Sequence, residues 1–153
     1  MRVAVISEFY CDEENANAHA AHMLIEGLLT SDINVDIFTI DESDVHRGKI
    51  REDNNVFYVE RKSKELCFNM PSKAYKLITH IRNIRLIPRW PLESPDEAKE
   101  MVSLLMSQMK EERYDGIIAV HKTFLSVAVC EEIKRIYPKM YYILYLLDPI
   151  ANE

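Results

Sequence analysis

Five short segments of the chain are almost continuously apolar and rich in β-branched and aromatic residues. They cover residues 2–7, 34–40, 56–59, 116–120 and 140–147. Runs of this length and composition are typical of strands that are buried on both faces of a parallel sheet. We therefore expect strands that begin near Arg2, Asn34, Val56, Gly116 and Met140.

The segment after the first predicted strand has the spacing of an amphipathic helix. Apolar residues recur at intervals of three and four from Ala16 to Leu28. Asn15 or Asn17 can cap this helix, because a short amide side chain accepts hydrogen bonds from the free amides of the first turn.

Two further helices are predicted before the fourth and fifth strands. Ser94 is followed by a proline and two acids, a combination typical of a helix start, and the pattern predicts a helix from Pro95 to about Arg113 with Ser94 as its cap. Thr123 can cap another helix that runs to Ile136. The alternation of strands and helices predicts an α/β fold, a Rossmann-like three-layer sandwich with a mostly parallel sheet of at least five strands, in one domain over 1–153.

The charge of the chain is unevenly distributed. The formal net charge is −6, yet residues 66–92 contain five basic residues and no acid, which leaves a charge of −11 on the remainder. Apolar residues at helical spacing predict a basic amphipathic helix over 71–90. Such an island indicates an anionic partner surface, or alternatively an ordinary solvated helix face.

Several classes of site are excluded by composition. The three cysteines are widely separated and form no C-x-x-C pair, so neither a disulfide framework nor a zinc site is predicted. His19 and His22 lie three residues apart without a third ligand nearby, so no metal is expected. A glycine-rich dinucleotide fingerprint is absent. With no signal peptide and no long apolar run, we expect a cytoplasmic protein that does not span a membrane.

Two stretches resemble the N-terminal halves of GT-B glycosyltransferases, especially the family 4-like ones. The first comprises residues 1–10, 18–29 and 35–39, a strand, a long helix and a second strand. The second, residues 114–121, looks like the family's recurring strand that ends in histidine. The resemblance implies that this chain is the N-terminal domain that binds the acceptor in a two-domain enzyme, whereas a C-terminal Rossmann-like domain binds the nucleotide sugar.

The same resemblance limits what the chain can do alone. No E-x7-E donor motif is present, so the donor domain is missing and we expect no sugar transfer and no cofactor in this chain. Many relatives also place a Gly-Gly pair in the loop after the first strand, where this chain has residues 15–18 with the sequence Asn-Ala-Asn-Ala. Close approach of a phosphate through this loop is therefore not expected.

Sheet geometry and the resemblance both place the ligand crevice at the carboxyl ends of the strands. The candidate residues there are Glu8, Phe9, Tyr10, Asn15, Asn17, His19, His121, Lys122, Thr123 and Asp148. Lys122 and a helix start beside His121 suit an anion or sugar, and the Asp148 carboxylate suits an acceptor base. The alternative is that these residues form ordinary capped turns. No catalytic residue is assigned.

The basic helix provides a second hypothesis, because GT-B enzymes that act on lipid-linked acceptors commonly dock on anionic membranes. The residues concerned are Lys73, Lys76, Arg82, Arg85, Arg89 and Trp90. Nucleic acid is not expected as a partner, because few aromatic residues interleave these charges.

Two further expectations concern the whole chain. The alternative function is a flavodoxin-like or receiver-like signalling module, although the acids that a receiver needs do not directly follow the first strand. The apolar segment 141–147 at a sheet edge also predicts a homodimer through that edge.

Overall fold

A computed structural model of the chain describes residues 1–8, 10, 16–41, 55–60, 95–121 and 124–146. The predicted basic helix lies outside these residues, and so do five of the candidate crevice residues. These five are Phe9, Asn15, Lys122, Thr123 and Asp148. The same holds for the six residues of the predicted membrane-docking surface, which are Lys73, Lys76, Arg82, Arg85, Arg89 and Trp90.

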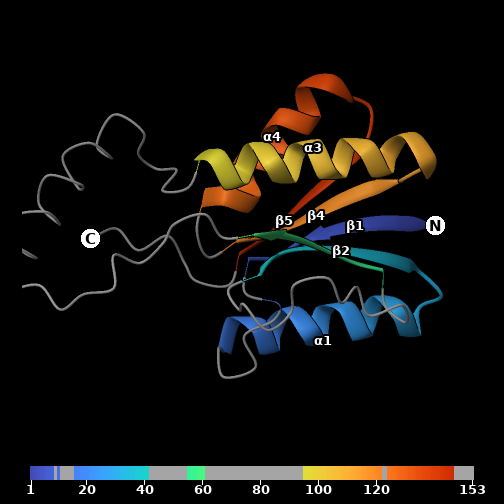
Figure 1. Cartoon of the computed structure of the whole chain (residues 1–153). Coiled ribbons are helices and arrows are strands. Elements are labelled where there is room, and N and C mark those ends of the chain that lie inside the picture. The colour runs from blue at the N-terminus through green and yellow to red at the C-terminus, as the bar shows by residue number, and fades with distance from the viewer. Residues whose placement is uncertain (9, 11–15, 42–54, 61–94, 122–123, 147–153) are drawn as a thin grey trace, which may run out of the picture.

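The described residues form a five-stranded sheet between two layers of helices (Figure 1). The strands are β1 (Arg2–Ile6), β2 (Asn34–Asp41), β3 (Val56–Glu60), β4 (Gly116–His121) and β5 (Tyr141–Leu146). The helices are α1 (Ala16–Thr30), α3 (Pro95–Glu111) and α4 (Phe124–Ile136). All four strand pairs are parallel, α1 lies on one face, and α3 and α4 lie on the other. The predicted Rossmann-like sandwich is therefore confirmed.

The strands lie in the order β3-β2-β1-β4-β5. Strands β2 and β3 are therefore added on one side of β1, and β4 and β5 are added on its other side. The helix that follows β1 covers one face and the helix that follows β4 covers the other (Figure 1). Ligands of open α/β sheets bind at such a switch point, beyond the carboxyl ends of the strands. The order is that of the Rossmann fold, whereas a flavodoxin-like sheet has β1 between β2 and β3.

Two apolar cores fill the space between the sheet and its helices. Successive residues of β1 point to opposite faces, so Val3 and Val5 pack with α1, whereas Ala4 and Ile6 pack with α3 and α4. The rings of Phe38 in β2 and Phe57 in β3 stack with centroids 4.9 Å apart in the core between the sheet and helices α3 and α4. Burial on both faces explains why the strands are almost continuously apolar.

The helix ends agree with the capping chemistry to within two residues. Helix α3 begins at Pro95 with two acids in its first turn, and it ends at Glu111 rather than at residue 113. Helix α1 continues two residues beyond Leu28, and the chain turns at Asp32, whose φ is 56°. Aspartate tolerates this left-handed conformation better than most residues, so it can end the helix.

One charged group in the α3-side core has partners from distant parts of the chain. Asp36 in β2 is fully buried. Its carboxylate accepts hydrogen bonds from Arg2 Nε at 2.8 Å, from Arg2 Nη2 at 3.2 Å and from the Tyr114 hydroxyl. Arg2 Nη1 also lies 2.6 Å from Glu112 Oε2. This network lies at the amino ends of the strands and joins β1, β2 and the segment before β4.

Strand β5 forms one edge of the sheet and remains largely exposed. Five of its six side chains are exposed, and Tyr141 retains 75% of its accessible surface. Tyr142 is the exception, because it packs against the core under α4 and its hydroxyl donates to the Tyr137 carbonyl at 2.9 Å. The apolar segment that the sequence places at a sheet edge therefore does lie at an edge of the described sheet, and most of its side chains are exposed.

Candidate functional site

Buried polar side chains gather at the carboxyl edge of the sheet. Among the described residues, the buried polar or charged ones are Ser7, Glu8, Asp36, Thr39, Glu97 and Ser126. Asp36 belongs to the network at the amino edge, and the other five lie at the carboxyl edge. Burying a polar group costs free energy unless it is hydrogen-bonded, so such a concentration marks the edge as chemically distinct.

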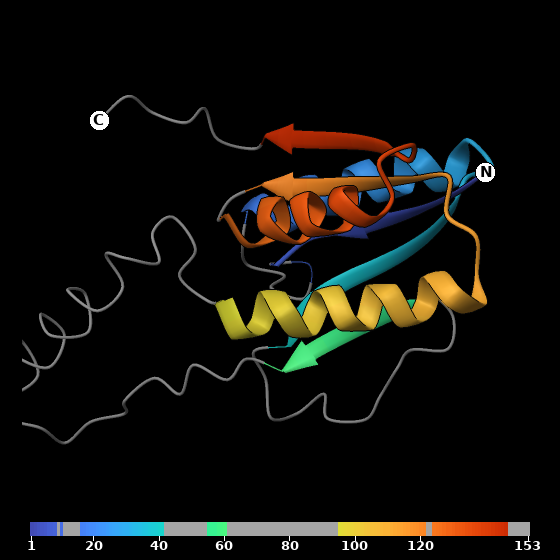
Figure 2. The ribbon, with the colours of Figure 1, turned by 90° about the horizontal axis from the view of Figure 1, so that it is seen from above.

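The topology explains why these five residues lie at the same edge of the sheet. Ser7 and Glu8 directly follow β1, and Thr39 lies near the end of β2. Glu97 and Ser126 lie in the first turns of α3 and α4. Each helix of a parallel crossover begins where the preceding strand ends, so the starts of α1, α3 and α4 share this edge with the strand ends (Figures 1 and 2).

The backbone after β1 is held in place by the neighbouring strand. The Ser7 amide donates to the Phe38 carbonyl at 2.9 Å, which continues the pairing of β1 with β2 beyond the last residue of β1. Glu8 follows directly and is only 7% exposed. Glu8 therefore stands directly after a residue whose backbone is hydrogen-bonded to β2.

Tyr10 is held against α1 by His22. The two rings stack with centroids 4.3 Å apart and an interplanar angle of 23°. His22 Nε2 lies 2.9 Å from the Tyr10 carbonyl oxygen, which can only accept, so Nε2 carries the proton of this hydrogen bond. A role for His22 as an anchor was not predicted from sequence, because the contact joins a loop to a helix without a recognisable spacing.

Two hydroxyl groups at this edge have no partner within the described part of the chain. They are Thr39 Oγ1 and Ser126 Oγ, and both residues are buried. One carboxylate oxygen each of Glu97 and Glu100 also accepts no hydrogen bond there, although each residue makes another interaction. Because buried polar atoms in folded proteins are nearly always hydrogen-bonded, these two hydroxyls are unusual among the described residues.

Some of the predicted crevice residues lie at this edge. Glu8 and Tyr10 follow β1, and Asn17 lies half-buried in the first turn of α1. His121 ends β4, opposite Leu146 of β5. His19 is exposed on α1. The structure thus brings Glu8, Tyr10 and Asn17 to one edge, together with the backbone of His121.

The sequence interpretation missed four of the five buried polar residues at this edge. Ser7 was interpreted only as the last residue of the first strand. Thr39 is one polar residue in an apolar strand, Ser126 lies in a helical apolar run, and Glu97 was interpreted only as a first-turn acid. The available signal was position, because each stands within a few residues of a carboxyl strand end or of a helix start.

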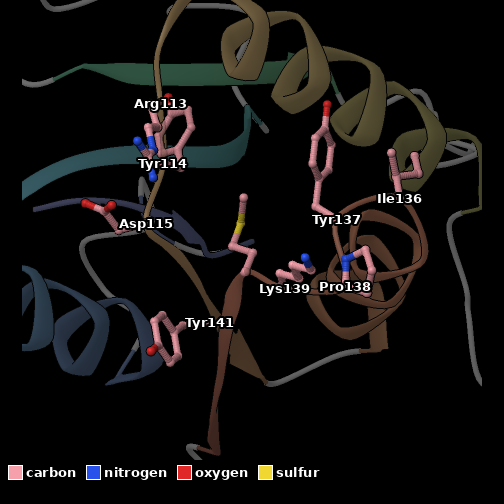
Figure 3. A pocket seen from close by; sticks show the side chains of 9 residues that line it. Arg113, Tyr114, Asp115, Ile136, Tyr137, Pro138, Lys139 and Tyr141 are labelled. Atoms are coloured by element: carbon pink, nitrogen blue, oxygen red, sulfur yellow. The ribbon is translucent and has the colours of Figure 1, made fainter.

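A pocket of about 500 Å³ lies at the opposite edge of the sheet, away from the switch point. Its lining comes from the segment before β4 and the turn before β5 (Figure 3). Within the described chain, its two cations, Arg113 and Lys139, form no ion pair. The turn is fixed by the Met140 amide, which donates to the Tyr137 carbonyl at 3.1 Å. The pocket is separate from the polar edge.

The structure adds two observations about metals and membranes. No group of three or more potential metal-ligating side chains occurs among the described residues. No helix in the same part of the chain is both long enough and apolar enough to cross a membrane. A scan of protein-family models and a search of curated proteins find no match to this chain.

Proposed function

We propose that this chain is the acceptor-binding N-terminal domain of a glycosyltransferase that moves a sugar from a nucleotide donor to a hydroxyl group. The proposal is supported by the Rossmann strand order and by the sequence resemblance to GT-B enzymes. The observation that carries it is the set of buried polar side chains at the carboxyl edge of the sheet, which are Ser7, Glu8, Thr39, Glu97 and Ser126. Transfer itself requires a donor domain, so the chain alone is inactive.

The chemistry of the edge suits a neutral ligand rich in hydroxyl groups. A carboxylate such as Glu8 accepts hydrogen bonds from sugar hydroxyls, and the free hydroxyls of Thr39 and Ser126 can donate or accept. Tyr10 offers an aromatic ring at the same edge, where it stacks on His22. Glu8 and Glu97 also repel phosphate at short range, which favours the acceptor over the nucleotide as the ligand of this domain.

The alternative of a flavodoxin-like or receiver-like module gains no support from the strand order. Both belong to the class in which β1 lies between β2 and β3, whereas β2 lies between β1 and β3 in this sheet. The GT-B proposal is therefore preferred.

Calorimetric titration tests the proposal, with a panel of alkyl glycosides as acceptor probes and nucleotide sugars as donor probes. We expect heat of binding from at least one glycoside and none from nucleotide sugars. Glu8→Gln should weaken glycoside binding at least about tenfold, because hydrogen bonds to a charged group contribute about 1.5–3 kcal/mol. Glu132→Gln, which changes an exposed acid on α4, is the matched control. Binding of nucleotide sugars alone, or equal binding by both variants, would contradict the proposal.

Membrane docking by the basic segment is a second part of the proposal and depends on sequence alone. Its five basic residues are Lys73, Lys76, Arg82, Arg85 and Arg89. We expect the chain to float with vesicles that contain anionic lipid and not with neutral vesicles. Replacing the five charges with glutamine should abolish flotation. Equal flotation with both kinds of vesicle would contradict the docking.

A further inference from the structure

The exposed apolar surface of the described chain is concentrated on β5. Nine large apolar residues are exposed in this part of the molecule, and five of them lie on this strand. They are Tyr141, Ile143, Leu144, Tyr145 and Leu146. Natural proteins protect the edges of their sheets with charges, proline or bulges, yet no charged residue or proline occurs within β5. The edge therefore has the properties of an interface.

The position of β5 also defines what its partner must supply. Among the described strands β5 pairs only with β4, so the backbone groups along its outer side pair with no other described strand. The incoming strand must be uncharged, since a charge would face an apolar side chain on either face of the sheet. The contact must also join a fixed number of molecules, because a contact that can be repeated without limit produces filaments.

We propose that a second copy of this chain is the partner, and that its β5 pairs antiparallel with β5 of the first copy about a two-fold axis at Ile143. An axis perpendicular to the sheet keeps each face of one copy continuous with the same face of the other. Ile143 then lies opposite Ile143 of the second copy, and Tyr141 lies opposite Tyr145 of the second copy. Tyr142 lies opposite Leu144 of the second copy, so every cross-strand pair is apolar or aromatic.

Self-pairing satisfies the requirements better than the other described edge of the sheet. In β3, Val56 and Val59 are buried, and Phe57 and Tyr58 are half-buried. Pairing β5 with β3 of another copy would also be heterologous and open-ended, whereas the two-fold β5 contact closes. Aromatic and β-branched cross-strand pairs such as Tyr–Tyr and Ile–Ile stabilise antiparallel pairing.

The size of the contact predicts a reversible dimer. Five paired β5 residues from each copy form a smaller contact than the roughly 20–30 residues a side of a standard stable interface. Tyr141 also lines the pocket at the amino edge, so Tyr145 of the second copy would lie at the rim of that pocket (Figure 3).

Sedimentation equilibrium of the whole chain over a wide range of concentration tests the dimer. We expect a monomer–dimer equilibrium for the unaltered chain and a monomer for Ile143→Lys, because two ammonium groups would then face each other at the axis. The control is Met23→Lys on α1, since Met23 is 62% exposed and Ile143 is 55% exposed. This control should dimerise like the unaltered chain.

A charge-pair experiment tests the register. Tyr141→Lys and Tyr145→Glu should each raise the dissociation constant of the dimer about tenfold, because each places a charge opposite a tyrosine. The double variant should restore the dimer, because each lysine then faces a glutamate of the second copy. Far-UV circular dichroism of each variant establishes that the monomer remains folded.

Three results would overturn the inference. The first is a chain that stays monomeric at all concentrations, which would leave the edge to a different polypeptide. The second is a series of growing oligomers, which would exclude a closed contact. The third is a dimer that Ile143→Lys does not weaken, or charge variants whose effects simply add, because either would place the interface or register elsewhere.

Discussion

The hydroxyl of Tyr114 donates a hydrogen bond to the carboxylate of Asp36, 78 residues earlier in the chain. The bond joins the segment before β4 to the amino-terminal half of β2, and Arg2 supplies the cation that Asp36 requires. A buried carboxylate without partners would lower the free energy of unfolding. The contacts with Arg2 and Tyr114 therefore stabilise β1, β2 and the segment before β4 together.

Tyr114→Phe should therefore destabilise the fold. The substitution removes one donor from a fully buried carboxylate, and we expect the free energy of unfolding to fall by about 1–3 kcal/mol. Urea denaturation measures this change. Ser103→Ala is the control, because removing this exposed hydroxyl on α3 should change stability by less than about 0.5 kcal/mol. Equal effects of the two substitutions would contradict a structural role for the Tyr114 hydroxyl.

Alkaline pH should weaken the fold through the same residue. Burial, and then the hydrogen bond to Asp36, raise the pKa of Tyr114 above its ordinary value of 10.0. The folded state thus retains a proton that the unfolded chain loses, so the stabilisation is complete below about pH 10 and is lost as pH rises further. Urea denaturation from pH 9 to pH 11 should show a steeper loss for the unaltered chain than for Tyr114→Phe. Parallel slopes would exclude this linkage.

Cys130 on α4 should react slowly with alkylating reagents in the folded chain. Burial raises the pKa of its thiol to about 11, and Lys134 offsets only part of that effect. Because the thiolate is the reactive form, iodoacetamide at pH 8 should label Cys130 at least about tenfold more slowly in the folded chain than in urea. Mass spectrometry of the peptide that contains Cys130 follows the reaction. Equal rates in the two states would show that the thiol is not protected.

Thr39→Val should separate stability from binding. The Thr39 hydroxyl is buried and has no hydrogen-bond partner among the described residues, so an isosteric valine should leave the free energy of unfolding unchanged or raise it by up to about 1 kcal/mol. If the hydroxyl contacts an acceptor, glycoside affinity should fall roughly 2- to 10-fold. Thr30→Val, which alters an exposed hydroxyl on α1, should leave that affinity unchanged. A clear loss of stability in Thr39→Val would show that the hydroxyl already has a partner.

The strands and helices were predictable because their signals are local. Buried parallel strands are apolar throughout, as in β1, and a proline followed by acids marks the start of α3. The burial of Asp36 was not predictable, because an aspartate between two apolar residues of a strand suggests a solvent-facing position. Its partners, Arg2 and Tyr114, lie 34 and 78 residues away, and only the folded chain brings them together.

The candidate site was predictable in position but not in its full composition. Strand order and crossover geometry place any ligand at the carboxyl edge, which includes Glu8 and Tyr10. Thr39 and Ser126 carry no distinguishing motif, and their importance follows from burial without a partner, a property of packing. The stacking of Tyr10 on His22 is likewise a tertiary contact.

The most direct test of the central claim is a nitrogen–proton NMR titration of the labelled chain with alkyl glycosides. Our account predicts that the amide resonances that move belong to the carboxyl edge, namely those of Glu8, Tyr10, Asn17, Thr39 and Ser126. Nucleotide sugars and flavin mononucleotide should leave these resonances in place. Movement confined to the pocket beside Tyr137 and Lys139, or a response to flavin mononucleotide alone, would contradict the assignment of this edge as an acceptor site.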